Sequence, residues 1–332
     1  MSSLKNNNLL KLITGIVISI AFLYLAFGKI NLDQMSKSFQ QANFWIFIPT
    51  VFMTLIAHWL RGMRWQLFLK SIKKVSVWSL FSATMIGYMG NTVLPAHLGE
   101  VFRANVVGNR EGIPTSSVLA TLVIERIIDV LTLLVIMVVA VFIYPFPDWV
   151  TKSGYIMFAL TLALFAFLVL LKRQNRFTLG VLRIALKLFP KFIARKIEEL
   201  LQAFIKGING LDRKRDYFSM FLLSLMIWGC YWLALHLLFY SFNLIEVYHV
   251  NTVSSVVLLV ITTISIVVPS SPGYVGTYHY LCQLSLALFG VPRSVGLSFA
   301  IVAHGLSILP TALIGFIFVW KEGIDRLKTT RE

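Results

Sequence analysis

Residues 77–108 read VWSLFSATMIGYMGNTVLPAHLGEVFRANVVG, and residues 251–290 read NTVSSVVLLVITTISIVVPSSPGYVGTYHYLCQLSLALFG. Both stretches are apolar enough for a membrane, but helix-breaking residues interrupt the first at 91–95 and the second at 269–276. Such breaks expose backbone polar groups, which is tolerated at membrane depth only where protein or a water-filled cavity surrounds them. Two breaks in matching places of two halves predict a transporter-type site.

The composition indicates an integral membrane protein, a single membrane domain over residues 1–332. The chain is 58% hydrophobic with a mean hydropathy of +0.79, far above the needs of a soluble core. Besides the two broken segments, six stretches are predicted to span: 9–28, 43–61, 117–144, 154–171, 217–242 and 294–320. We read the first as a retained helix because it lacks a small-residue cleavage site. The predicted fold class is an all-α polytopic membrane protein with about six spanning helices and two broken, re-entrant helical hairpins.

The positive charge predicts the orientation. The formal net charge is +16, and basic residues gather in loops 61–76 and 172–216 and at the C-terminus. The loops that would face outward are poor in Lys and Arg: 29–42, 145–153 and 243–250. By the positive-inside rule, both termini lie in the cytoplasm and the protein sits in the cell inner membrane. This pattern, with no recognisable binding module, argues against nucleic acid as a partner.

The two halves share one order of elements, which is two spans, a broken hairpin and a long span. Half 1 covers about 9–144 and half 2 about 154–320. Three crossings per half predict an inverted repeat, with the hairpin tips approaching from opposite faces. At 1.5 Å per residue the arms of the first hairpin, 78–92 and 96–108, are too short to cross. The arms of the second, 251–268 and 273–289, are longer, so it either re-enters or spans twice.

Segment 177–211 repeats apolar residues near helical spacing among lysines and arginines, which is typical of a helix in the cytoplasmic interface. It either recruits anionic lipid or simply links two spans. Cys230 and Cys282 lie in apolar runs and are expected to be small buried hydrophobes. No metal-ligand spacing links His304 to the other histidines, so we expect no metal and no cofactor.

The first hairpin carries four candidate headgroup-binding residues: Asn91, Pro95, Glu100 and Arg103. Pro95 is suited to start a short helix, whose free N–H groups would attract a phosphate or carboxylate. Glu100 and Arg103 share a helix face. They form either a local ion pair or part of a polar pathway, because charges in an apolar hairpin are costly.

Three charges lie in the span at 117–144: Glu125, Arg126 and Asp129. Asp129 shares a face with both others, and we expect all three to point into the bundle. The cluster is either a salt bridge that locks this helix to the hairpin through Arg103, or a headgroup or proton site.

The second hairpin supplies the remaining candidates: Pro269, Pro272, Gly273, Gly276 and His279. Proline and glycine at this density unwind the backbone. His304, in the last span, makes either a helix–helix hydrogen bond or a ligand contact.

In this order, the motifs resemble the lysylphosphatidylglycerol synthase transmembrane region, or flippase-like domain family. They are Asn91-TVLPAHLGEVFR to Arg103, Glu125-RIID to Asp129, and Pro269-SSPGYVG to Gly276. The match covers about residues 10–320. Many members carry Gly in place of Tyr274 and Glu in place of His279, which puts an acid's role at 279 in doubt, although a histidine can handle a proton.

The resemblance implies a membrane domain that moves or binds lipid. In bacterial multiple peptide resistance factors, such a domain moves an aminoacylated lipid between leaflets and a separate soluble domain makes it. Because this chain ends at Glu332, we expect no synthase domain, and because no catalytic constellation is recognisable we expect no enzyme activity. Three functions remain open: a translocator of a lipid or lipid-linked molecule with a polar, anionic headgroup; a non-transporting scaffold of an envelope-biosynthesis complex; and an intramembrane transferase acting on a lipid-linked substrate. The sequence leaves open whether the protein acts alone, as an oligomer or with envelope-biosynthesis partners.

Overall fold

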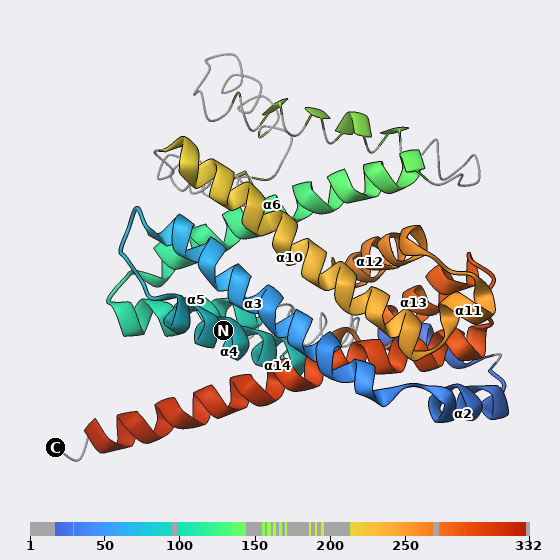
Figure 1. Ribbon diagram of the computed structural model, residues 1–332. Helices are drawn as coiled ribbons and strands as arrows, with labels where there is room; N and C mark the ends of the chain where they lie inside the picture. The colour runs from blue at the N-terminus through green and yellow to red at the C-terminus, as the bar shows by residue number, and fades with distance from the viewer. Residues whose placement is uncertain are drawn as a thin grey trace. The chain divides into compact units, whose positions relative to one another are not determined.

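The computed structural model describes residues 17–28, 30–94, 98–143, 213–267 and 272–329, with scattered positions between 155 and 195. Every described element is a helix, which confirms the all-α prediction for this part of the chain. The apolar helix Val17–Phe27 comes first. It is followed by α2 (Leu32–Gln41), η1 (Phe44–Ile46), α3 (Phe47–Leu69), α4 (Val77–Val93), α5 (Leu98–Glu111), α6 (Thr115–Ile143), α10 (Lys214–Ser241), α11 (Leu244–Tyr248), α12 (Thr252–Val267), η2 (Pro272–Tyr274), α13 (Thr277–Ala287) and α14 (Arg293–Thr329) (Figure 1).

Several predictions fall wholly or largely outside these residues. The predicted span 154–171 is described only at scattered positions, and segment 177–211 at fewer still. Pro95 and Pro269 are not among the described residues.

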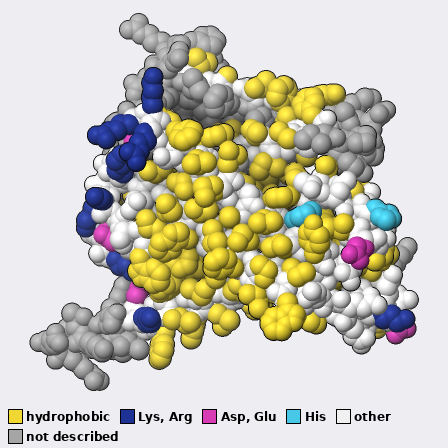
Figure 2. Space-filling view, viewed as in Figure 1, with side chains coloured by type: hydrophobic (Ala, Val, Ile, Leu, Met, Phe, Trp, Pro, Cys, Tyr) yellow, Lys and Arg dark blue, Asp and Glu magenta, His cyan; other side chains and the backbone are white. Residues whose placement is uncertain are grey.

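Three described helices are long and apolar enough, by length and composition, to cross a membrane: Phe44–Leu69, Lys214–Ser241 and Arg293–Glu322. They correspond to the predicted spans 43–61, 217–242 and 294–320. Figure 2 shows that hydrophobic side chains dominate the face in view. Large apolar side chains are exposed along all three helices, among them Phe52, Phe221 and Phe316. Contiguous exposed apolar surface of this kind is suited to lipid rather than water.

The second break lies where the sequence predicts it, whereas the first, predicted at 91–95, begins after Val93, because Asn91 and Thr92 still belong to α4. Helix α4 ends at Val93 and α5 begins at Leu98, while α12 ends at Val267 and α13 begins at Thr277. In the second break, Gly273, Tyr274 and Gly276 all have positive φ angles, of 69°, 59° and 93°. Left-handed residues cannot continue a right-handed helix, so the chain must change direction here. A Cβ at Gly276 would lie 2.5 Å from the carbonyl oxygen of Ser19, so glycine also permits close packing of the first helix.

Helix α3 corrects one prediction. The sequence interpretation ended this span at residue 61 and assigned 61–76 to a basic loop, whereas the helix runs on to Leu69. Arg61 and Arg64 are therefore helix residues, 4% and 0% exposed. The loop keeps the positive charge of Lys70, Lys73 and Lys74.

The chain divides into two compact units. Unit 1 comprises residues 1–60, 81–103 and 226–332, and unit 2 comprises 61–80 and 104–225. Unit 1 is built around α13, which packs against α12 and α14, while α2 also packs on α14. Figure 1 shows α2, α11, α12 and α13 gathered near the N-terminal part of α14.

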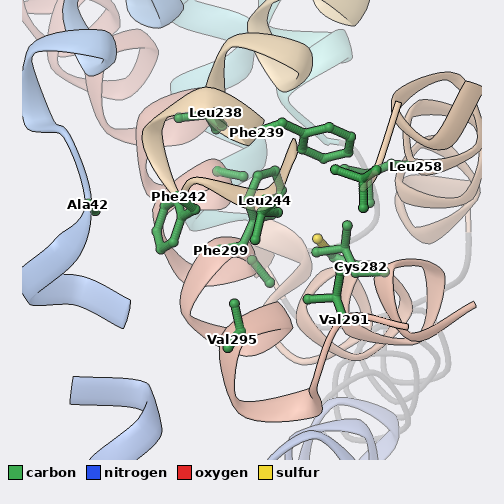
Figure 3. Close-up of a cluster of buried hydrophobic side chains, with 14 of the residues drawn as sticks. Ala42, Leu238, Phe239, Phe242, Leu244, Leu258, Cys282, Val291, Val295 and Phe299 are labelled. Atoms are coloured by element: carbon green, nitrogen blue, oxygen red, sulfur yellow. The ribbon is translucent and has the colours of Figure 1, made fainter. Parts of the chain in front are cut away.

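The hydrophobic core of unit 1 contains residues from α10 to α14, including Phe239, Phe242, Leu258, Cys282 and Phe299 (Figure 3). The ring of Phe299 lies 5.6 Å from the rings of both Phe239 and Phe242. Cys282 is a free, fully buried cysteine, as its apolar surroundings predict. In a membrane protein such close packing stabilises the helix contacts through van der Waals attraction rather than through removal of water.

The side chain of Gln283 links helix ends in unit 1 through hydrogen bonds. The amide Nε2 of Gln283 donates to the carbonyl of Ala26 at 3.2 Å and to that of Arg293 at 2.9 Å. The carbonyl of Ala26 lies in the last turn of the first helix, where intrahelical partners are missing, and that of Arg293 lies at the start of α14.

Helix α14 contains Pro310. A proline cannot donate the hydrogen bond that would reach the carbonyl four residues earlier. Hydroxyl groups supply local bonds around it, because Thr311 donates to Ser307 O at 3.0 Å and Ser307 donates to His304 O at 2.9 Å.

Candidate functional site

A buried ion-pair cluster lies in unit 2, between α3 and α6. Arg61 Nη1 lies 2.6 Å from Glu125 Oε1 and 2.7 Å from Asp129 Oδ2. Arg64 Nη2 lies 2.6 Å from Asp129 Oδ1, and Arg64 Nη1 donates to Ser224 Oγ at 3.0 Å. Two cations thus face two carboxylates, and all four side chains are buried.

This cluster satisfies its charges within the protein. Buried charges are tolerated only when they are paired and hydrogen-bonded, and removing one partner is strongly destabilising. Trp65 Nε1 adds a bond to Thr121 Oγ1 at 2.8 Å on the same pair of helices. The arrangement joins α3 to α6 and, through Ser224, to α10.

The cluster differs from the prediction in its partners. The sequence interpretation linked Asp129 to Arg126 and suggested Arg103, whereas its close salt bridges run to Arg61 and Arg64. The side chain of Arg126 is 41% exposed and only 4.0 Å from Asp129, so it does not point into the bundle as expected. The reason is helical geometry, because Glu125 and Asp129 are one turn apart on the face toward α3, while Arg126 lies about 100° further round.

The first hairpin is held together by Asn91 and three glycines. The backbone N–H of Gly99 donates to Asn91 Oδ1 at 2.9 Å, so Asn91 caps the first turn of α5 across the break. A Cβ at Gly90 would lie 2.9 Å from the Cα of Gly99, and one at Gly87 would lie 3.0 Å from the Cβ of Arg103. One free N–H of the predicted anion site is therefore already occupied.

The charged candidates of this hairpin have different surroundings. Arg103 is 3% exposed and packs against Gly87, while Glu100 is partly buried.

The second hairpin forms an aromatic group around His304 of α14. Its ring stacks on Tyr278, with centroids 4.6 Å apart and 16° between planes. The ring of His279 lies perpendicular to it, with centroids 4.8 Å apart. The N–H of Gly276 donates to His279 Nδ1 at 3.3 Å, which caps α13 and fixes the imidazole of His279.

Both hairpin breaks line one pocket of about 240 Å³ in unit 1. Thr92 comes from the end of α4, Pro272, Gly273 and Val275 from the second break, and the rest from α14, namely Ile301, His304, Gly305, Ile308 and Leu309. A Cβ at Gly273 would lie 3.6 Å from the carbonyl oxygen of Thr92, so the two breaks are near van der Waals contact. Two segments that are 180 residues apart in the sequence, Thr92 and Pro272 among them, therefore meet at one place.

His304 is the polar side chain with unmet bonding capacity in this pocket. Only 7% of the residue is exposed, and Nε2 has no hydrogen-bond partner among the described residues. The ring makes a hydrogen bond to the backbone of Gly273. A buried polar atom without a partner is costly and points to a missing ligand or water.

The structure thus places some of the predicted residues together at the pocket and others elsewhere. Pro272, Gly273 and His304 line the pocket, and His279 holds His304 from the side. Asn91 and Gly276 cap the helices that lead away from the breaks. Glu125 and Asp129 belong to the ion-pair cluster of unit 2.

Sequence reasoning missed the roles of Arg61, Arg64 and Thr92. Arg61 and Arg64 lie three residues apart between apolar and aromatic residues, in HWLRGMRWQLF, a signal for a helix that continues with one charged face. Thr92 carries no such signal. Among the described residues, no group of three or more His, Cys, Asp or Glu side chains is placed to hold a metal ion.

Comparison with known proteins identifies the same family that the sequence motifs indicate. The family model described as "Lysylphosphatidylglycerol synthase TM region" matches residues 12–315. A UPF0104 membrane protein of Methanocaldococcus jannaschii is 25% identical over 94% of this chain and 96% of its own length. A UPF0104 membrane protein of Pyrococcus horikoshii is 24% identical over 92% and 96%.

A shorter match links the chain to an enzyme. The glycosyltransferase AglD of Haloferax volcanii is 39% identical over 75 residues, which are 22% of this chain and 12% of that protein. No solved structure matches the chain. The family match over most of the chain, with its apolar helices, shows that this integral membrane protein belongs to the lysylphosphatidylglycerol synthase TM region family.

Proposed function

We propose that this protein moves a lipid or lipid-linked molecule with a polar headgroup from one membrane leaflet to the other. The observation that carries the proposal is the pocket in unit 1, where two helix breaks and the unpartnered Nε2 of His304 adjoin. A headgroup that enters hydrocarbon loses water, at a cost of several kcal/mol for each unpaired polar group. Freed backbone groups and an imidazole replace part of that hydration, which lowers the barrier to crossing.

The proposal includes a topology. We take both broken hairpins as re-entrant and the two halves as inverted repeats, so that the breaks meet near the bilayer midplane. The protein would lie in the cytoplasmic (inner) membrane with both termini in the cytoplasm, as the basic loops favour. Neither a cofactor nor a metal is needed for such movement.

The ion-pair cluster has a supporting role in this proposal. Its arginines and carboxylates already neutralise one another. A headgroup that competed for them would have to break short, buried bonds, which is costly. We therefore assign the pocket, and not Glu125 or Asp129, to substrate binding.

The match to a glycosyltransferase favours a second candidate, an intramembrane transferase acting on a lipid-linked sugar. The shared segment is a small part of that enzyme, and it need not include its catalytic part. Product formation by the purified protein with candidate sugar donors would establish this activity. Its absence, with transfer between leaflets intact, would eliminate it.

Reconstituted liposomes test the proposed function. Purified protein is inserted into vesicles with headgroup-labelled lipids, and transfer is followed as loss of signal after an impermeant quencher is added. The panel should contain anionic, zwitterionic and polyprenyl-linked lipids. We expect transfer of at least one class at a rate well above that of protein-free vesicles.

A pocket-filling variant shows whether transfer uses this pocket. Gly305 lines it, and a Cβ there meets only the end of the Leu309 side chain at 3.9 Å, so Gly305→Leu fills the space without a backbone clash. Gly229→Leu is the matched control, because Gly229 lies in α10 with nothing within 4 Å of its Cβ position. We expect Gly305→Leu to abolish transfer and Gly229→Leu to retain it. Equal transfer by both variants would exclude the pocket, and no transfer by folded wild-type protein would favour the scaffold function.

A further inference from the structure

We propose that the headgroup accepted by this pocket is uncharged and rich in hydroxyl groups, as in a sugar or polyol lipid. The inference rests on the proposed function in taking the pocket as the headgroup site. It replaces the anionic headgroup that the sequence predicts with a different chemical class. Three properties of the lining support it: its charge, its hydrogen-bonding atoms and its apolar rim.

The described part of the lining carries no ionised side chain. None of the nine residues that the structure describes around the pocket is Lys, Arg, Asp or Glu. An anionic headgroup brought here would lose its water without gaining a counter-charge, and an unpaired buried charge is far more costly than an unpaired hydroxyl. Arg103 is buried against Gly87 and is not part of the lining.

The polar side-chain atoms of the described lining can pair with hydroxyl groups. Nε2 of His304 has no partner among the described residues, and a hydroxyl can donate to it or accept from it, whichever ring nitrogen carries the proton. Thr92 Oγ1 donates its proton to Tyr88 O at 3.0 Å, so its lone pairs remain for a ligand that donates. Sugar and polyol hydroxyls pair with both groups. A phosphate diester has only acceptors and would leave the Thr92 lone pairs unpaired.

The rest of the lining is apolar and partly exposed. Leu309 is 62% exposed and Val275 is 40% exposed, and both border the pocket. Apolar side chains at a rim can contact hydrocarbon tails while the headgroup lies inside. This favours an amphiphile over a free sugar. A space of about 240 Å³ holds about eight waters at ~30 Å³ each, which suits one small headgroup.

Binding and transfer measured side by side test the inference. The protein is purified in a detergent without a sugar headgroup, and binding is read from the thermal unfolding midpoint or by native mass spectrometry. The lipids share their acyl chains: a monoglucosyl diacylglycerol, a phosphatidic acid and a phosphatidylcholine. A polyprenyl-phosphate hexose is added as a sugar lipid that carries a phosphate charge. We expect the uncharged monoglucosyl lipid to bind at least about tenfold more tightly than the other three, and preferential binding of the polyprenyl-phosphate hexose would overturn the uncharged class.

The matched variants are His304→Phe and His236→Phe. Both histidines stack on an aromatic ring, His304 on Tyr278 and His236 on Trp232, but His236 bonds to Ser255 at 3.1 Å and is outside the lining. We expect His304→Phe to weaken sugar-lipid binding about tenfold, equivalent to ~1.4 kcal/mol, and His236→Phe to leave it unchanged.

The outcomes separate this inference from the proposed function. Preferential binding of phosphatidic acid, or sugar-lipid binding that is indifferent to His304→Phe, would overturn the inference even if transfer continued. Sugar-lipid binding without any transfer would support the inference and overturn the translocator function. Failure of folded protein to bind any lipid would overturn both.

Discussion

The ion-pair cluster of unit 2 and the pocket of unit 1 both bury polar groups, yet they differ in how those groups are satisfied. In the cluster, Arg61 and Arg64 meet Glu125 and Asp129 at 2.6–2.7 Å, so the charges are paired, although Nε of Arg64 makes no hydrogen bond among the described residues. In the pocket, Nε2 of His304 has no partner among the described residues. Groups that satisfy one another stabilise the fold, whereas a group left unsatisfied lowers stability and is available to a ligand. Stability and transfer should therefore respond in opposite ways to changes at the two places.

Asp129→Asn should give the largest loss of stability. The change removes a charge that two buried arginines share. Arg61 keeps Glu125, but Arg64 loses its carboxylate partner, which should lower the free energy of unfolding by ~3–5 kcal/mol. Denaturant unfolding in detergent micelles measures it. Arg126→Gln is the control, because that side chain is 41% exposed and should cost less than ~1 kcal/mol. Equal losses from both changes would mean that the cluster is not a structural lock.

Gly99→Ala should cost less, ~1–3 kcal/mol, through overpacking. An added Cβ would overlap the carbonyl oxygen of Gly87 and lie 2.5 Å from Asn91 Oδ1. Since this hairpin supplies Thr92 to the pocket, lipid transfer should fall together with the unfolding midpoint. Gly229→Ala, where nothing lies within 4 Å, should instead stabilise α10 by ~0.5–1 kcal/mol. A Gly99→Ala variant with unchanged stability would contradict the close packing of α4 on α5.

Asn91→Ala should lower stability by ~1 kcal/mol, the usual cost of a lost helix cap. The N–H of Gly99 would lose its acceptor at the break. Thermal unfolding checks the size of the effect. Asn109→Ala serves for comparison, because its side chain is exposed and makes one long bond of 3.4 Å to Asn105. If Asn91→Ala abolished transfer at unchanged stability, Asn91 would have a direct role in binding as well as its role as a helix cap.

His304→Phe should have the smallest effect on stability, within ~1 kcal/mol, because it removes one backbone bond and one unpaired atom together. Lipid transfer by the same variant should be lost. A stable His304→Phe variant without transfer, compared with an unstable Asp129→Asn variant, would distinguish a binding role of the pocket from a structural role of the ion-pair cluster. A loss of several kcal/mol would place His304 among the structural residues, contrary to the proposed site.

The sequence predicts the breaks between the helices well because their signals are local. Proline and glycine at Pro272, Gly273 and Gly276 exclude a continuous helix, whatever packs around them. The end of α12 and the start of α13 follow from these residues within a few positions. The family is also predictable, because its motifs stand in order on an apolar background.

Other features depend on contacts that no local pattern specifies. Arg61 resembled the first residue of a basic loop, since charge density alone cannot tell a helix end from a helix with a buried charged face. Thr92 lines the pocket because its segment contacts one that lies 180 residues further along the chain. His304 becomes a candidate binding residue only when the structure shows that its neighbours leave Nε2 without a partner.

Pro310 has a mechanical consequence for α14. The carbonyl of Leu306 loses its helical hydrogen bond at the turn that also carries Ile308 and Leu309 of the pocket wall. Bending is cheapest where a backbone bond is already missing, and the hydroxyls of Ser307 and Thr311 can exchange carbonyl partners as the angle changes. Bending of the last helix is therefore expected at this turn, beside the pocket.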